Sequence, residues 1–541
     1  MIRVSEIRLP LDHPPSALKA AVLARLKIRP EELLSFTVFK RAADSRKKSA
    51  ILLVYIVDAD VKDEAGLLAR LGADRHIART PDMTFRLSAT APAKTGAPRP
   101  LVIGFGPCGI FAALILAEAG FRPIVLERGK IVRERTVDTF KFWRQRVLNP
   151  ASNVQFGEGG AGTFSDGKLY SQIRDPDHYG RKVLTEFVEA GAPEEILYVS
   201  RPHIGTFRLV SMVENMRAKI EALGGEIRFQ SQVSDIAISE TGGRKRIAGV
   251  VLANGETIAS RHVVMALGHS ARDTFEMLHR RGVYFEPKPL SIGVRIEHPQ
   301  SLIDRARYGK FAGDKILGAA DYRLSHHAKN GRTVYSFCMC PGGAVVAAAS
   351  EEGRLVTNGM SQYSRKERNA NSGIVVSLSP EDFPGDANEN PLAGIEFQRH
   401  WESRAFVAGG ASWRAPAQLV GDFLKDVPST ELRSAEPSYR PGVTPTDLAL
   451  CLPAWAVEAI REALPVFGRQ IKGFDMDDAV MTGVETRTSS PIRMKRRDDH
   501  QSLSVDGLYP AGEGAGYAGG IYSAAIDGIR TAQALAVDLA R

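Results

Sequence analysis

The chain has 541 residues, enough for about two to four domains and a large buried core. Hydrophobic residues make up 44% and charged residues 25%, as in ordinary globular proteins. No apolar run is long enough for a transmembrane helix, and the N-terminus has no apolar core of signal-peptide length. Four cysteines do not make a disulfide framework, so a reducing cytoplasm is the expected compartment.

The positive charge is concentrated near the N-terminus. Residues 1–99 hold 18 Lys and Arg against 11 Asp and Glu, which accounts for +7 of the net +9. Such a region suits nucleic acid, an anionic membrane surface or an acidic partner. A solvated basic surface without any such partner is the simpler interpretation.

The first 88 residues predict a small α+β unit. Leu18, Val22 and Leu26 recur as one face of a helix would. Residues 36–40 and 51–57 are rich in β-branched and apolar side chains and predict strands, with the basic stretch 40–48 as their hairpin connection. Residues 89–99 are small, Pro-containing and non-periodic, which predicts a linker.

A β-α-β pattern follows the linker. Residues 101–103 predict a buried strand, 107–119 a helix that Gly120 ends, and 123–127 a second strand. Parallel strands need such a crossover.

The turn between the first strand and this helix fits G-x-G-x-x-G. Gly104 permits the tight turn, Gly106 lets a pyrophosphate approach the backbone, and Gly109 lets the helix pack on the strand. Glu127, at the end of the second strand, is placed to accept hydrogen bonds from a ribose. A 2′-phosphate site would prefer arginine there; Arg128 follows directly, but the glutamate disfavours NADP.

The later chain is less regular. Residues 132–168 are glycine-rich, 207–223 predict a helix, and 226–238 and 247–252 predict strands. Residues 285–477 mix strands, loops and helices without a nucleotide-binding signature of their own.

Two later segments pair a strand with a glycine turn. One strand ends at Ala266 and leads into Gly268. The other, near the C-terminus, leads into Gly512-Glu513, and Gly519-Gly520 then precedes a helix predicted over 521–539.

Together these segments resemble the FAD-binding elements of the glutathione-reductase-like, two-dinucleotide-binding-fold flavoprotein superfamily. The resemblance implies that FAD is the cofactor and that the last helix directs its N-terminus at the flavin. Here leucine at position 267 and Glu513 stand where the superfamily carries threonine and aspartate. The implied cofactor residues are Gly104, Gly106, Pro107, Gly109, Glu127, Arg128, Gly162, Gly268, Gly512, Glu513, Gly519, Gly520 and Ile521.

More narrowly, the chain is similar to an uncharacterised bacterial family of FAD-dependent dehydrogenases. The stretches that carry this similarity lie at 156–169, 268–274, 292–299, 340–343, 357–361 and 483–491. The similarity spans most of the chain, but it does not name a substrate.

Candidate catalytic groups are few. Lys168 and Ser165, in the stretch FGEGGAGTFSDGKL, either hydrogen-bond near the reactive edge of the flavin or belong to a loop that covers the phosphates or adenine without chemistry. Arg487 is a candidate for stabilising the reduced flavin. Cys338 and Cys340, on one face of a predicted strand, are interpreted as core cysteines, so neither a disulfide reductase nor a metal site is expected.

Arg295, Glu297 and His298 form a further polar set, which is interpreted as a structural ion pair. Hydrolase and P-loop motifs do not occur in the sequence.

The sequence therefore predicts an α/β, glutathione-reductase-type FAD-binding fold at residues 97–285 and 478–541. It predicts an inserted mixed α+β substrate domain at 286–477 and a basic α+β domain at 1–92. The expected function is an FAD-dependent oxidoreductase that transfers hydride between a small molecule and flavin. NAD(P)H is either a transient electron donor or not the donor at all. The alternatives are an RNA- or tRNA-binding or tRNA-modifying flavoprotein and a non-catalytic flavin-binding protein.

Overall fold

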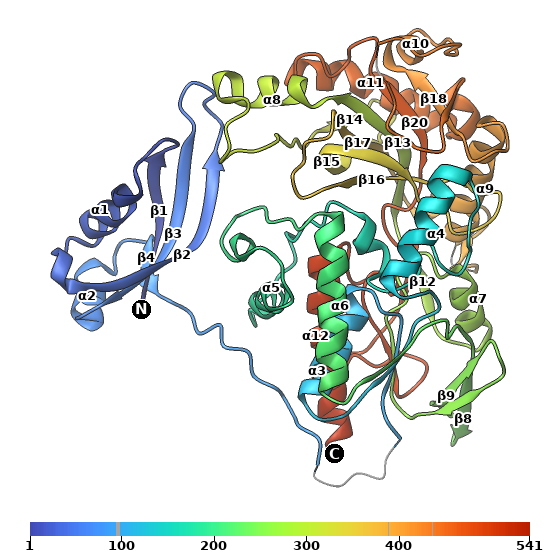
Figure 1. Ribbon diagram of the computed structural model, residues 1–541. Helices are drawn as coiled ribbons and strands as arrows, with labels where there is room; N and C mark the ends of the chain where they lie inside the picture. The colour runs from blue at the N-terminus through green and yellow to red at the C-terminus, as the bar shows by residue number, and fades with distance from the viewer. Residues whose placement is uncertain (93–97, 388, 435) are drawn as a thin grey trace.

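The computed structural model describes residues 1–92, 98–387, 389–434 and 436–541. The fold is mixed α/β and contains a parallel sheet (Figure 1). The predicted linker at 89–99 lies partly outside the described residues, as does the start of the predicted FAD-binding domain at residue 97.

The first 80 residues form an antiparallel sheet, here called the N-terminal sheet, with strand order β2-β3-β1-β4. Its elements are β1 (Ile2–Pro10), α1 (Pro15–Leu26), β2 (Leu33–Asp44), β3 (Leu52–Val61), α2 (Glu64–Leu71) and β4 (Ile77–Arg79). The predicted helix face is confirmed, because Leu18, Val22 and Leu26 are buried on α1. The predicted connection at 40–48 is wrong in its first half, since pairing between β2 and β3 continues to Asp44 and Leu52.

The N-terminal sheet contacts two other parts of the chain. The Arg41 N–H donates to the Tyr198 carbonyl over 2.6 Å, and the Ser200 N–H donates to the Arg41 carbonyl over 2.9 Å. Phe311 and Leu317, which follow α8 (Gln300–Tyr308), pack against the core under this sheet.

The parallel sheet has the strand order β22-β11-β5-β6-β7. Its strands are β5 (Leu101–Ile103), β6 (Ile124–Leu126), β7 (Glu226–Arg228), β11 (Val263–Met265) and β22 (Leu508–Pro510). Helices α3 (Pro107–Glu118), α6 (Thr206–Ala222) and α12 (Ile521–Leu539) lie side by side on one face (Figure 1). Strands β5, β6, β11 and β22 and the three helices confirm the elements predicted from the sequence.

Alternate residues of the parallel strands enter two different cores. Val102, Val125 and Val264 face the helices α3, α6 and α12. Leu101 and Ile103, with their neighbours on adjacent strands, face α7 (Arg272–Arg280) and an antiparallel sheet of β8 (Val233–Thr241), β9 (Arg244–Leu252) and β10 (Thr257–Ala259). Burial on both faces explains why these short strands are uniformly apolar. The strand predicted over 226–238 is two strands, β7 and β8, because each pairs in a different sheet.

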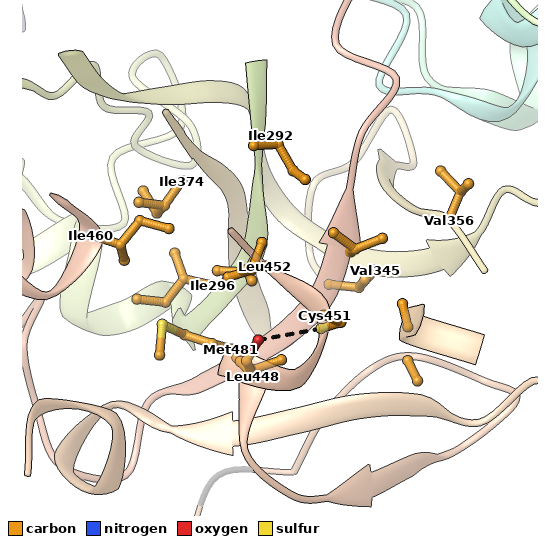
Figure 2. Close-up of a cluster of buried hydrophobic side chains, with 14 of the residues drawn as sticks. Ile292, Ile296, Val345, Val356, Ile374, Leu448, Cys451, Leu452, Ile460 and Met481 are labelled. Carbon is orange, nitrogen blue, oxygen red and sulfur yellow. Dashed lines mark hydrogen bonds between the residues drawn. The ribbon is translucent and has the colours of Figure 1, made fainter. Parts of the chain in front are cut away.

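A larger sheet occupies the region between residues 290 and 485, with strand order β14-β15-β17-β13-β20-β18-β19 and β16 paired with β15. Its strands are β13 (Leu290–Pro299), β14 (Ser325–His327), β15 (Thr333–Ala347), β16 (Thr357–Ser361), β17 (Asn369–Leu378), β18 (Ala415–Leu419), β19 (Val443–Pro445) and β20 (Val480–Glu485). Helices α9 (Ala393–Ala408), α10 (Val420–Leu424) and α11 (Ala454–Gln470) pack around it. Figure 2 shows part of its core, in which the buried Cys451 thiol donates to the Leu448 carbonyl.

Two short strands connect the parallel and large sheets. β12 (Phe285–Pro287) leads out of the parallel-sheet region and β21 (Ile492–Met494) leads back, and they pair with each other in antiparallel register. The remaining helices discussed below are α4 (Val132–Gln145) and α5 (Tyr179–Glu189).

Candidate functional site

Three predicted segments meet at one edge of the parallel sheet. Strands β5, β11 and β22 are neighbours, so their carboxyl ends lie together. The turns after them touch: a Cβ atom on Gly104 would lie 2.5 Å from the Ala266 carbonyl oxygen, and one on Gly514 would lie 2.3 Å from the Gly268 carbonyl oxygen. Only residues without a side chain permit these approaches.

Helices α3 and α12 begin at this edge. Gly106 precedes α3, whose first residue is Pro107. A Cβ atom on Gly109 would lie 1.9 Å from the Gly104 carbonyl oxygen, so the turn into α3 requires glycine there. Gly520, with a φ of 138°, precedes α12. The first turns of both helices offer backbone N–H groups and the positive ends of helix dipoles, which favour a negatively charged group.

The α12 end of the site is open. Gly519 and Gly520 are exposed, and a Cβ atom on either glycine would meet nothing within 4 Å. Gly268 is also exposed, with a φ of 70° and free space around its Cβ position. Gly512 is buried and packs on Cys108 in the first turn of α3. The edge therefore combines a tightly packed part beside α3 with an open part beside α12.

Glu127 ties together three pieces of backbone. Its buried carboxylate accepts hydrogen bonds from the N–H groups of Phe105 at 2.8 Å, Gly129 at 2.9 Å and Gly157 at 2.9 Å. A carboxylate offers about four acceptor positions, so one position remains for a ligand hydroxyl.

Arg128 is occupied by protein groups. Its Nη2 donates to both carboxylate oxygens of Asp273, at 2.9 and 2.7 Å, and its guanidinium lies 4.4 Å from the centre of the Phe156 ring. This guanidinium is already neutralised, so the structure offers no free arginine here for a 2′-phosphate.

The glycine-rich stretch after residue 156 packs on the first turn. The Gly159 N–H donates to the Phe105 carbonyl over 2.8 Å, and a Cβ atom on Gly160 would lie 2.9 Å from Gly106 Cα. Farther along, a Cβ atom on Gly162 would lie 2.9 Å from Ile521 Cγ1. This stretch therefore bridges the beginnings of α3 and α12.

The shape of the stretch depends on Arg135, a residue of α4. Arg135 is fully buried, and its guanidinium donates to the carbonyls of Asn153 at 2.7 Å, Val154 at 2.8 Å, Glu158 at 2.6 Å and Gly160 at 2.8 Å. A planar guanidinium with several fixed donors suits this task. Sequence reasoning missed Arg135, because a charged residue in an amphipathic helix gives no sign that it is buried.

The two catalytic candidates of this stretch, Ser165 and Lys168, have different hydrogen-bond partners. The Ser165 hydroxyl donates to the Gly162 carbonyl at 2.7 Å and accepts from the Gly167 N–H at 3.0 Å, so it stabilises a local turn. Lys168 instead reaches the large sheet, where its ammonium donates to the Met339 carbonyl. It also lies 3.8 Å from Asp166.

Cys338 lies beside Lys168 and is not a core cysteine. Its side chain is exposed, whereas Cys340, Cys108 and Cys451 are buried. Cys338 has a φ of 42°, and the pairing of β15 with β17 is irregular on both sides of Cys340. Cys338 is exposed beside this irregularity while Cys340 stays buried, which overturns the prediction that both are core cysteines. Protein atoms nevertheless crowd Cys338, and this desolvation raises the pKa of its thiol to about 11.

Arg295 pairs with a different acid than its sequence neighbours suggested. It lies 2.6 Å from Glu485 on β20, and its Nη1 donates to the Cys338 carbonyl at 2.9 Å. Glu297 accepts instead from Asn369 and Ser438. The Arg295–Glu485 ion pair therefore stabilises the backbone at Cys338 through the hydrogen bond to its carbonyl.

Arg487 lies in a buried charge cluster. Glu402 accepts hydrogen bonds from Arg487 at 3.1 Å and from Arg272 at 2.7 Å. Burial alone would raise the pKa of Glu402, but the two arginines reverse this effect and hold it below its usual range. Arg487 also donates to Ser270, which links the cluster to the turn after β11.

His269 lies in that turn. Burial, followed by the charges of Arg487 and Arg272, lowers the pKa of His269 to about 3, so its imidazole is neutral at physiological pH.

Glu513 lies in the turn after β22, where its carbonyl accepts from the Gly516 N–H at 2.9 Å while its carboxyl has no hydrogen-bond partner among the described residues. Burial raises the pKa of its carboxyl to about 7, although neighbouring Lys288 opposes this shift. Lys288 and Arg493 lie close to it, and sequence reasoning missed both because neither belongs to a glycine motif.

A protein of Clostridium beijerinckii described as uncharacterised is 48% identical over 534 residues, which are 98% of each chain. Residues 289–488 match the family "FAD-dependent protein, C-terminal domain-like", and residues 1–60 match a domain of unknown function, DUF8436. The chain belongs to the same family as the Clostridium beijerinckii protein, and its residues 289–488 carry the FAD-dependent C-terminal domain. The matched residues 289–488 contain all strands of the large sheet, Cys338 and Arg487.

Solved structures give weaker similarities to the chain. The flavin-dependent brominase Bmp2 is 13% identical, with 82% of this chain and 80% of that chain covered and a TM-score of 0.36. The 3-ketosteroid-Δ4-(5α)-dehydrogenase of Rhodococcus jostii RHA1 is 12% identical, with coverage of 84% and 100% and a TM-score of 0.34. CtdE in complex with FAD is 14% identical, with coverage of 82% and 88% and a TM-score of 0.31. TM-scores this low assign no function.

The described residues show neither a metal-binding cluster nor a membrane-spanning helix. Among them, no cluster of His, Cys, Asp and Glu could hold a metal ion. In the same part of the chain, no helix has the length and apolar character needed to cross a membrane.

Proposed function

We propose that the chain is an FAD-dependent oxidoreductase that binds FAD along the carboxyl edge of its parallel sheet. The convergence of the turns after β5, β11 and β22 carries this proposal, because an extended dinucleotide needs contacts from all three. The family match supports FAD as the cofactor.

The domain division follows from the same interpretation. A glutathione-reductase-type FAD-binding domain would comprise residues 97–285 and 478–541, with a substrate domain inserted at 286–477 and an N-terminal domain at 1–92. The N-terminal, parallel and large sheets each have a core of their own, which supports three domains, although β20 pairs within the large sheet and residues 142–164 pack into its core.

The residues at the edge fit an extended dinucleotide. Gly106 and the first turn of α3 would hold the diphosphate, and the free acceptor position on Glu127 would take a ribose hydroxyl. Glu513 has an unpartnered carboxyl for a ribityl hydroxyl. The exposed backbone of Gly519 and Gly520 leaves room for the flavin at the start of α12.

When bound, FAD would accept or donate the hydride of the reaction. Lys168 and Cys338 would face the substrate from the opposite side of the site, since Lys168 joins the glycine-rich stretch to the large sheet. Lys168 carries a charge that can orient an electron-rich substrate group. Arg487 would act as a positioning residue through Ser270, because protein groups fill its own hydrogen-bonding positions.

The test begins with the purified protein under anaerobic conditions. A flavin that NADH or NADPH reduces would make a nicotinamide the electron donor. A flavin that neither reduces, but that dithionite reduces and a substrate library reoxidises, would place the donor elsewhere. Flavin that no substrate reoxidises would favour the non-catalytic alternative.

A further inference from the structure

Three charged side chains gather where the connecting strands join the parallel sheet. Arg493 lies on β21 opposite Glu286 of β12, Lys288 follows β12, and Glu513 follows β22. The Lys288 N–H donates to the Pro491 carbonyl at 2.8 Å, so the two connecting segments stay together beyond their strands. One guanidinium nitrogen of Arg493 reaches the Gly516 carbonyl at 3.4 Å, in the same loop as Glu513.

Positive charge at this place lacks compensation. The Lys288 ammonium has no hydrogen-bond or ion-pair partner among the described residues, and Arg493 Nε is buried without a partner. Burial and the neighbouring Arg493 lower the pKa of Lys288, which Glu513 only partly offsets. Two half-buried cations beside one carboxyl whose own ionisation is disfavoured leave an excess of positive charge. A bound anion would remove this penalty.

Lys495, only two residues after Arg493, shows the contrast. Its ammonium lies 3.0 Å from Glu286, so an acid of the protein already compensates it. The unpaired charge is therefore a property of Lys288 and Arg493 and not of the whole strand pair.

The position of Lys288 and Arg493 near the start of α3 indicates which anion they would bind. Gly512, next to Glu513, packs against Cys108 in the first turn of α3, so the Glu513 loop adjoins the N-terminus of that helix. Both the helix end and the cations attract negative charge. In oxidised FAD, the formal negative charge lies on the diphosphate.

We propose that Lys288 and Arg493 form an anion site for the diphosphate of FAD. Their positive charges would add to the positive end of the α3 helix dipole. This assignment rests on the proposed function. It gives the connecting strands, which lie outside every glycine motif, a direct role in holding the cofactor.

The test compares two ligands and four variants. Holoprotein is stripped of flavin, and the apoprotein is titrated calorimetrically with FAD and with ADP, which carries the diphosphate but no flavin. Lys288→Met and Arg493→Met should each weaken the binding of both ligands about ten- to a hundredfold, the range of a lost charge-assisted hydrogen bond. Each should also flatten the salt dependence of binding. Lys495→Met, the matched control, should bind both ligands as the unchanged protein does.

Three results would separate this site from its alternatives. If both substitutions weaken FAD but leave ADP unchanged, the cations face the flavin and the diphosphate assignment is wrong. Unchanged binding of both ligands also overturns it. If the unchanged protein binds no FAD, the proposed function itself fails. Circular dichroism checks the fold, and Lys288→Arg, which keeps the charge, should retain most of the affinity if Lys288→Met is unstable.

Discussion

Gly514 and Gly268 meet so closely that a Cβ atom on Gly514 would lie 2.3 Å from the Gly268 carbonyl oxygen. This contact joins the turn after β22 to the turn after β11, two strands that pair in parallel. The cofactor edge therefore depends on backbone contacts between segments far apart in the sequence.

Gly514→Ala should separate these two turns. The methyl group would displace backbone and not a flexible side chain, so we expect FAD affinity to fall at least tenfold. Gly313→Ala provides a control of the same chemistry, since a Cβ atom there would meet nothing within 4 Å. Because Gly313 has a φ of 88°, some loss of stability is expected in the control, but FAD affinity should stay the same. Equal affinity in both variants would contradict the contact's role.

Arg135→Met should disrupt the glycine-rich stretch. The substitution leaves several buried carbonyls without donors, and the expected loss of stability is about 3 kcal/mol or more. Arg135→Lys should rescue little, because an ammonium cannot reach donors spread over a guanidinium's width. Thermal unfolding and bound-flavin content measure both effects. A fully stable, flavin-loaded Arg135→Met protein would show that the stretch holds its own shape.

Glu402→Gln should leave the buried Arg487 without its ion-pair partner and Arg272 with Glu351 alone. Breaking a buried ion pair on one side costs about 3–5 kcal/mol. Glu436→Gln, at an acid that is 73% exposed and pairs with Arg368, should change stability little. Chemical denaturation of both variants is the measurement, and equal midpoints would mean that the cluster contributes no net stability.

Glu513 should make the stability of the apoprotein depend on pH. Its folded-state pKa of about 7 exceeds the ordinary 4.5, so the folded state binds the proton more tightly than the unfolded state. Stability should therefore fall as pH rises through this window, by up to about 3 kcal/mol. Glu513→Gln should remove that part of the decline. Melting curves of the unchanged protein and of Glu513→Gln at pH 5 and pH 8 test this. Identical pH profiles for the two proteins would show that Glu513 does not cause the pH dependence.

Cys338 should be the thiol that alkylating reagents modify first, because Cys108, Cys340 and Cys451 are buried. Its raised pKa keeps it protonated at neutral pH, so the rate should rise about tenfold per pH unit between pH 7 and pH 9. Mass spectrometry of peptides after brief labelling identifies the site. Fast labelling that survives in Cys338→Ser would contradict this exposure.

The parts of the fold that the sequence predicts are those with local steric rules. The turn between β5 and α3 requires glycine at positions 104 and 109. Burial on both faces of the sheet requires apolar residues along β5 and β11. The strand at 226–238 was predicted as one element because periodicity does not show that a chain changes sheets.

The rest of the candidate site depends on tertiary contacts. The structural role of Arg135 can be recognised only when the carbonyls that it binds are seen in the structure. The unpaired charge of Lys288 can be recognised only when its charged neighbours are seen. Cys338 was predicted to be a core residue on the assumption that side chains alternate regularly along β15. The alternation is broken at an irregularity in the strand, which residue composition does not reveal. The roles expected for Lys168, Arg487 and the basic N-terminal region stay predictions.

Titration of the flavin-free protein with FAD tests the central claim most directly. The account predicts saturable binding of one FAD per chain, visible as a shifted flavin absorbance spectrum, and its loss in Gly109→Ala, where a Cβ atom would lie 1.9 Å from the Gly104 carbonyl oxygen. A folded protein that binds no FAD, or a Gly109→Ala protein that binds it as tightly as the unchanged chain, would contradict the account.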